Sequence, residues 1–256
     1  MKYLDSTLAR SSLRSELEAL LTGLERHPVF SNPYFDLLRR GRWDAASYEL
    51  HRANFFYRTE LTVKAIAQVC SRAAAQEDQD TLILFAYILD EECGKGRREA
   101  CHAKLMEDSH NLFGASEFGL APLAVKAAKD HPGIIPETSE YRDRLNGLIT
   151  GNYHHMLGVV MALESHADKM LRACREAFRN ARRAMDPLGY RNQVEIYFNC
   201  HLENGLEERH AADARTCVAN NVRGAEDLLS IRYGAEEALK AQARMWDALS
   251  RKAEGR

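Results

Sequence analysis

Long stretches of helical periodicity, free of glycine and proline, constrain this chain more than any other feature. The segment 43–75 contains neither residue, and its apolar side chains recur every three or four positions. β-Branched residues are sparse and nowhere alternate with polar ones over the length of a strand. The pattern therefore predicts an all-α protein of about eight helices. Helical patterns cover residues 11–26, 31–41, 43–75, 78–92, 99–113, 116–129, 138–185, 190–222 and 225–252.

The chain shows no internal repeat, low-complexity segment or linker, so we expect a single helical domain over residues 1–256. Long helices with short connections pack as a bundle, and bundle cores commonly hold metal sites. Hydrophobic residues make up 45% of the sequence and charged residues 28%, which is typical of a globular protein.

Charge and segment composition exclude several classes of protein. The net charge of −2 gives no basic field for nucleic acid. The first residues are charged rather than apolar, and no apolar run reaches the roughly eighteen residues of a membrane span. We therefore expect a cytoplasmic protein that binds neither nucleic acid nor membrane. The six cysteines form no CxxC pair, so we expect free thiols.

Acidic and imidazole side chains occur together in three segments, of which the first is EECGKGRREACH, with Glu92 and His102. On a straight helix these residues are about 280° apart in rotation and would not share a face. Gly94 and Gly96 lie between them, and a break there would allow both side chains to point inward. The alternative is a helix C-terminus with surface acids and an unrelated histidine.

The second segment, MLGVVMALE, ends at Glu164. Leu157, Val160 and Met161 lie in the same helical sector, so we expect the Glu164 carboxylate to be buried. A buried carboxylate needs a cation or a metal ion as its partner. The alternative is a surface acid beside the apolar stripe.

The third segment, HLENGLEERH, contains an Asn-Gly pair at 204–205 in the middle of a helical pattern. On an unbroken helix Glu203, Glu207 and His210 share one face, and His201 lies opposite. If the Asn-Gly pair forms a bulge or an unwound turn, His201 instead joins Glu207 and His210 on one face. Both arrangements keep Glu207 and His210, and they differ in whether His201 or Glu203 accompanies them.

Together the segments offer a ligand inventory for two iron ions in a helical bundle. Carboxylates that bridge two metal ions balance their charge, imidazoles supply neutral donors, and few protein ligands leave room for dioxygen. Iron performs redox chemistry that no side chain can. The candidate ligands are Glu92, His102, Glu164, His201, Glu207 and His210.

These motifs resemble those of the haem-oxygenase-like dimetal oxidases, all-α proteins that share a fold with haem oxygenase, the TenA proteins and pyrroloquinoline-quinone synthase. Their signature is a Glu with a downstream His, a Glu on a later helix, and HxxxDxxH near the end. EECGKGRREACH, LGVVMALE and HLENGLEERH resemble these elements in turn, and the resemblance spans most of the chain. It implies a single haem-oxygenase-like bundle that binds two Fe(II) ions per chain and uses O2.

The third element departs from the family pattern. Glu207 replaces the usual Asp, and two extra residues separate it from His201, so Glu203 remains the alternative ligand. Family members that oxygenate nitrogen have an additional carboxylate from an early helix, which Glu60 would supply here. The alternative for Glu60 is an ion pair with Lys64 on the outer face.

The resemblance implies a non-haem di-iron oxidase or oxygenase that acts on a small amino-acid- or amine-like substrate in a specialised-metabolite pathway. Its outcomes are N-oxygenation, or C–H activation leading to desaturation, ring closure or C–C cleavage. His51, Tyr57 and His155 are candidates for the substrate cavity, and we expect a homodimer. The competing hypothesis is a metal-free enzyme of the same fold, either a TenA-like hydrolase or a quinone-synthase-like oxidase. A helical scaffold protein would instead expose Glu164, Glu207 and His210 to solvent.

Overall fold

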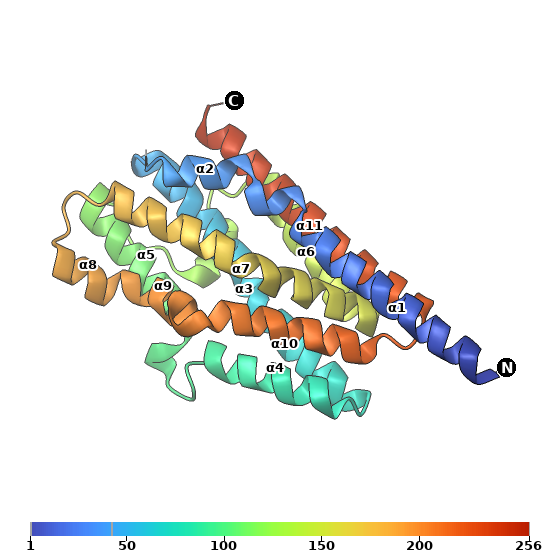
Figure 1. Ribbon diagram of the computed structural model, residues 1–256. Helices are drawn as coiled ribbons and strands as arrows, with labels where there is room; N and C mark the ends of the chain where they lie inside the picture. Colours follow the sequence, from blue (N-terminus) through green and yellow to red (C-terminus); the bar gives the residue numbers. More distant parts are fainter. Residues whose placement is uncertain (1, 42, 256) are drawn as a thin grey trace.

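The computed structural model of the chain describes residues 2–41 and 43–255, which form a bundle of long helices (Figure 1). These residues contain helices and no strand, which confirms the predicted all-α class. The α-helices are α1 (Lys2–Glu25), α2 (Pro33–Arg39), α3 (Ala45–Ala75), α4 (Gln79–Glu92), α5 (His102–Phe118), α6 (Pro136–Thr150), α7 (Tyr153–Ala181), α8 (Pro187–Gln193), α9 (Glu195–Leu202), α10 (Leu206–Asn221) and α11 (Ala225–Ala253).

Helix boundaries differ from the sequence prediction where polar residues and glycines interrupt the apolar pattern. The segment 138–185 is two helices, because α6 ends at Gly151 and the Asn152 side chain caps the start of α7. The helix predicted for 116–129 is wrong. The chain leaves α5 at Gly119, where φ is 68°, a left-handed conformation that glycine adopts at little cost.

Helix α7 lies in the middle of the bundle, with α11 along one side and α10 along another, and α4 lies next to α10 (Figure 1). Every residue of α7 from 156 to 164 is buried. A helix that is apolar on all sides belongs in the core. The sequence of α7 therefore carries Glu164, at the end of this run, into the interior.

Two glycines allow the backbones of α7 and α11 to touch. A Cβ atom on Gly158 would lie 2.1 Å from the carbonyl oxygen of Ile231, and one on Gly234 would lie 2.0 Å from that of His155. No side chain fits at such distances, so the two positions require glycine. The contact fixes the position of α7, and hence of Glu164, against α11, the helix with which α7 has its most extensive contact.

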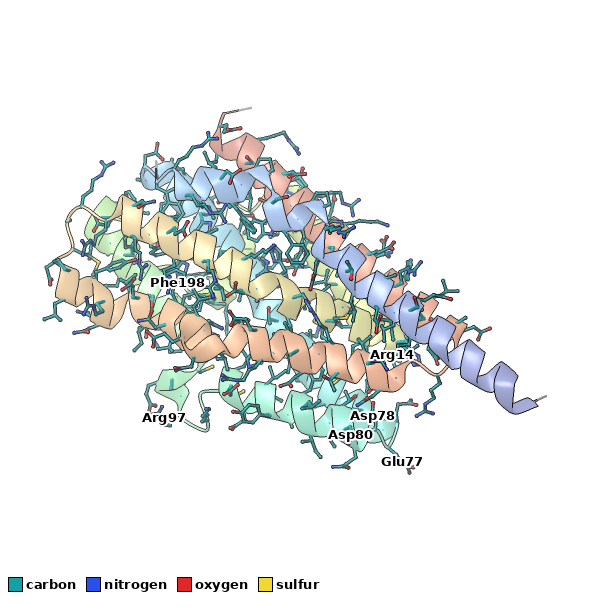
Figure 2. The ribbon with its side chains drawn as sticks, in the orientation of Figure 1. Arg14, Glu77, Asp78, Asp80, Arg97 and Phe198 are labelled. Carbon is teal, nitrogen blue, oxygen red and sulfur yellow. The ribbon has the colours of Figure 1, made fainter. Side chains whose placement is uncertain are left out.

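Asp78, at the start of α4, ties three helices together at one end of the bundle (Figure 2). Its carboxylate accepts hydrogen bonds from the Thr81 N–H at 3.1 Å, from the Tyr153 hydroxyl at 2.8 Å and from the Asn221 amide at 2.7 Å. Burial raises the pKa of Asp78, but these bonds outweigh burial and lower it. The bonds hold α4, α7 and α10, which carry most of the candidate ligands, in fixed relative positions.

Buried histidines make the stability of the fold depend on pH. Burial lowers the pKa of His51 and of His166 from 6.5 to about 3. Below pH 6.5 the unfolded chain therefore binds protons that the folded chain does not, and stability is lost as the pH falls towards 3. Between pH 7 and pH 5.5, where the unfolded imidazole takes up most of its proton, we expect the free energy of unfolding to fall by about 1.2 kcal/mol for each of these histidines.

Urea unfolding at about pH 7 and at about pH 5.5 measures this dependence. His166 packs among Phe30, Phe35 and Trp246, so phenylalanine suits its surroundings. In His166→Phe the free energy of unfolding should fall less between these two pH values, by the contribution of one histidine. A fall equal to that of the wild type would show that His166 is not held neutral in the folded state.

Candidate metal centre

The first two candidate ligands meet at the turn between α4 and α5. Glu92 ends α4 and His102 begins α5. Between them Gly94, Lys95 and Gly96 have φ values of 71°, 53° and 77°, and this left-handed turn separates the two helices. His102 Nδ1 lies 3.1 Å from a carboxylate oxygen of Glu92. Both side chains are buried, so the break at the glycines brings the pair into the interior.

Glu164 reaches the same region from α7. Its side chain is buried, and burial together with the negative charges of Glu207 and Glu92 raises its pKa well above the ordinary value. Three carboxyl groups from three helices therefore lie close enough to repel one another in a medium of low dielectric constant. Such a group is stable in its charged form only with a cation between its members.

The Asn-Gly pair decides which residue accompanies Glu207. Asn204 and Gly205 have φ values of 57° and 65°, and this left-handed pair separates α9 from α10. The resulting kink places His201 Nδ1 2.5 Å from Glu207 Oε1, with both side chains buried. Glu203 is exposed. His201, rather than Glu203, therefore lies with the other candidate ligands.

His210 is oriented by a carboxylate that the sequence analysis missed. Its Nε2 atom donates a hydrogen bond of 2.8 Å to Glu91, which precedes Glu92 on α4 and is also buried. Its Nδ1 atom lies 3.7 Å from Glu164, too far for a hydrogen bond, and has no hydrogen-bond partner among the described residues. A histidine held in this way through one nitrogen presents the other to a metal ion.

No local signal distinguishes Glu91 from its acidic neighbours. The sequence DEE places Asp90, Glu91 and Glu92 at the end of one helix, about 100° apart around its axis. The partner of Glu91 lies 119 positions further along the chain, on a helix whose packing against α4 the sequence does not state. Only the tertiary structure identifies Glu91 as part of the site.

The donor atoms meet the requirements of a metal centre. Ligand atoms of Glu164, Glu207 and His210 all lie within 4.8 Å of one another, and those of His102, Cys200 and His201 form a second such group. Carboxylates and imidazoles are donors suited to iron, and the unpartnered His210 Nδ1 faces the carboxylates. The residues present therefore fit the binding of metal ions.

Cys200 is a neighbour of the cluster that the sequence analysis did not identify. Its Sγ atom donates a hydrogen bond of 2.9 Å to the carbonyl oxygen of Tyr197. Burial raises the pKa of the Cys200 thiol, although its hydrogen bond with His102 acts in the opposite direction. Burial lowers the pKa of His102, but contacts with Cys200 and Glu92 outweigh burial and raise it to about 11. Cys200 thus lies beside His102 and His201 at the edge of the cluster.

A cavity of about 210 Å³ lies against these groups. Pockets for drug-sized ligands occupy about 300–1,000 Å³, so this cavity suits a smaller molecule. Its polar wall includes Glu92, His102, Glu164, His201 and Glu207, together with Arg58 and Tyr197. Most of the remaining wall is apolar, with Val63, Met106, Leu163, Ala167, Met170 and Leu171.

Glu60 also lines the cavity, but it pairs with another residue of the chain. Its carboxylate lies 3.0 Å from the guanidinium of Arg142, and its side chain is 43% exposed. The expected alternative partner, Lys64, instead donates a hydrogen bond to Asn146. The structure thus places Glu60 at the cavity but pairs its carboxylate with a cation of the protein.

The other candidates for the substrate cavity lie elsewhere, because their rings pack against other side chains. The Arg142 guanidinium covers the Tyr57 ring at 4.2 Å, and the His155 ring packs against Tyr233 at 4.9 Å. His51 is enclosed among aromatic rings, and its Nδ1 atom lies 3.0 Å from the Tyr34 hydroxyl. The described residues that line the cavity include none of these three candidates.

Glu91→Gln is expected to weaken iron binding by about 10- to 100-fold, because His210 loses the charged acceptor that orients it. Anaerobic titration with Fe(II) measures this change. Asp90→Asn is the matched control, since Asp90 is the adjacent acid and is exposed. Equal affinities in the wild type and in Glu91→Gln would contradict the orienting role.

A helical bundle whose buried carboxylates and imidazoles come from α4, α5, α7, α9 and α10 defines an all-α protein with a candidate metal centre. Residues 53–243 match the family described as iron-containing redox enzyme. The chain therefore belongs to the iron-containing redox enzyme family. No curated protein matches the chain.

Solved structures identify the fold. A CADD-like protein of unknown function from Nostoc punctiforme is 17% identical, with a TM-score of 0.71 over 93% of this chain and 99% of that one. A domain of unknown function with a heme oxygenase-like fold from Shewanella denitrificans is 18% identical, with a TM-score of 0.57 over 97% and 93% of the two chains. The fold is haem-oxygenase-like, as the sequence motifs predicted.

Among the helices of residues 2–41 and 43–255, none has both the length and the apolar character that crossing a bilayer requires.

Proposed function

We propose that this protein is a non-haem di-iron oxidoreductase that uses O2 to oxidise a small amino-acid- or amine-like molecule in a biosynthetic pathway. The observation that carries the proposal is the meeting of three buried carboxylates and three imidazoles, all of which except His210 line one small cavity. Membership of the iron-containing redox enzyme family supports iron as the metal.

The carboxylates and the imidazoles have different roles in this proposal. Glu92, Glu164 and Glu207 would neutralise the charge of two ferrous ions, and His102, His201 and His210 would complete the sites as neutral donors. Bound iron supplies the one-electron and dioxygen chemistry that side chains lack. The apolar wall of the cavity excludes water from the bound substrate, which limits side reactions.

The contacts of Glu60 bear on the reaction outcome. Its ion pair with Arg142 satisfies the carboxylate that an N-oxygenating enzyme would use as an additional ligand. We therefore favour C–H activation, which leads to desaturation, ring closure or C–C cleavage, over N-oxygenation. Arg142→Met would release Glu60, and a change of product in that variant would reveal a ligand role for this carboxylate.

Anaerobic titration with Fe(II), followed by rapid mixing with O2, tests the proposal. We expect uptake of about two iron ions per chain, a transient visible absorption band and consumption of O2. Aerobic incubation of the loaded protein with individual amino acids and amines should then show faster O2 consumption with the substrate. If the protein bound no iron and consumed no O2, a di-iron oxidase function would be excluded.

That negative outcome would favour the metal-free enzymes of the same fold. A TenA-like hydrolase needs a nucleophilic thiol, and the reactive form of a thiol is the thiolate. Burial raises the pKa of both Cys93 and Cys200, which disfavours the thiolate. The raised pKa values therefore disfavour Cys93 and Cys200 as the nucleophile of a hydrolase.

A further inference from the structure

Arg58 on α3 is a buried cation without an acidic partner. Its side chain is only 4% exposed, yet none of the ion pairs among the described residues includes it. Its nearest polar contacts are neutral, with the Gln242 side-chain oxygen at 3.1 Å and the Thr59 hydroxyl at 3.4 Å. A buried charge is costly unless it is paired, so this guanidinium needs an anion that the described chain does not supply.

Further polar atoms near Arg58 have no hydrogen-bond partner among the described residues. They include Arg58 Nε itself, the Gln242 amide nitrogen and the Trp246 indole nitrogen, all of them buried donors. The guanidinium lies 5.5 Å from the Trp246 ring centroid, which places these groups together between α3 and α11. Unsatisfied donors beside a buried cation indicate a place for an acceptor group, and of these three residues Arg58 is the one that lines the cavity described above.

The same guanidinium lines the cavity that the candidate metal ligands line. Tyr197 lines the same wall. Arg58 is thus the cation of a cavity whose other charged side chains are candidate ligands and Glu60.

We propose that Arg58 binds the carboxylate of the substrate and thereby presents the rest of the molecule to the metal ligands. This inference rests on the proposed function in that it takes the bound molecule to be the substrate. It narrows the class of substrate to small carboxylic acids, including amino acids. The planar guanidinium offers paired N–H donors that match a carboxylate. Among the described residues that line the cavity, Arg58 is the only Arg or Lys, which fits an acid of single charge better than a phosphate dianion.

Binding of two isosteric probes tests the proposal without any turnover. The probes are 4-methylpentanoate and its neutral analogue 4-methylpentanamide, titrated calorimetrically into the full-length protein. The titration is run after chelation of metal and again after loading with Fe(II), since a carboxylate also ligates iron. In the chelated protein we expect the acid to bind about 10- to 100-fold more tightly than the amide, as hydrogen bonds to a charged partner imply.

Variants locate the preference at Arg58. Arg58→Met should abolish the preference for the acid, and Arg58→Lys should retain part of it because it keeps the charge without the planar donors. Arg144→Met is the matched control, because Arg144 pairs with Glu237 at the surface. Circular dichroism checks the fold of each variant. If Arg58→Met does not fold, the affinities of the wild type and of Arg58→Lys for the acid and the amide still test whether Arg58 binds the carboxylate.

Two results would overturn the inference: equal binding of acid and amide by the chelated wild type, or an undiminished preference in folded Arg58→Met. Both are independent of iron and O2. Loss of the di-iron function with a retained acid preference would leave a carboxylate-binding site of another enzyme. Iron loading and O2 consumption without an acid preference would leave the proposed function and remove only the role of Arg58.

Discussion

Glu164→Ala is expected to reduce iron uptake from about two ions per chain to one or none. The carboxylate of Glu164 lies among Glu92, Glu207 and His210, so its loss removes a donor that no other described residue at that position replaces. Metal analysis after anaerobic loading measures the effect. Unchanged iron content would remove Glu164 from the ligand set.

Glu203→Ala is the informative control, because Glu203 is the alternative to His201 in the same segment. It is exposed, so the variant should bind as much iron as the wild type, whereas His201→Ala should bind less. If Glu203→Ala instead bound less iron than His201→Ala, the kink at the Asn-Gly pair would have to differ in the iron-loaded protein.

Stability separates a metal ligand from a structural side chain. The raised pKa of Glu164 means that, between pH 4.5 and that raised pKa, the folded protein retains a proton that the unfolded chain, with its ordinary pKa of 4.5, has released. This difference costs stability as the pH rises above 4.5. Metal-free Glu164→Gln should therefore be at least as stable as the metal-free wild type at neutral pH while it binds less iron. A large loss of stability would indicate a structural role.

Gly158→Ala is expected to destabilise the fold by about 3 kcal/mol, through overpacking between α7 and α11. The added methyl group would lie 2.1 Å from the Ile231 carbonyl oxygen, so the two backbones must separate. Unfolding in urea measures the change. The separation also displaces Glu164, six residues along α7, so iron binding should weaken in the same variant.

Gly147→Ala serves as the control for Gly158→Ala. Gly147 lies within α6, is exposed, and has nothing within 4 Å of the position of an added Cβ. Alanine there should stabilise the helix by about 0.5–1 kcal/mol. If both variants had the same urea midpoint, the close approach of α7 and α11 would not be a constraint on the sequence.

Much of the fold could be predicted from the sequence, because helix formation depends on the local periodicity of apolar residues. The run before Glu164 is an example, since residues apolar on all sides belong to a central helix wherever that helix packs. The prediction failed at Gly119 and at the Gly151–Asn152 boundary. There a capping side chain or a left-handed glycine stops a helix without removing the apolar pattern around it.

The candidate site was also partly predictable, because glycines mark the places where a helix can break. Glycines between Glu92 and His102 signalled a break, and the structure has a left-handed turn there. The choice between His201 and Glu203 remained open in the sequence, because the Asn-Gly pair is compatible with a continuous helix as well as with a kink. Both residues have a left-handed φ, and the kink places His201, and not Glu203, beside Glu207.

The sequence by itself determined the all-α class and supplied the candidate iron ligands, since both follow from side-chain chemistry and helical spacing. Only the tertiary structure decided that Glu91 orients His210, that Glu60 pairs with Arg142, and that Arg58 lines the ligand cavity without an acidic partner. Each of these facts depends on contacts between helices far apart in the chain. Local spacing carries no information about such contacts, because the packing of helices sets them.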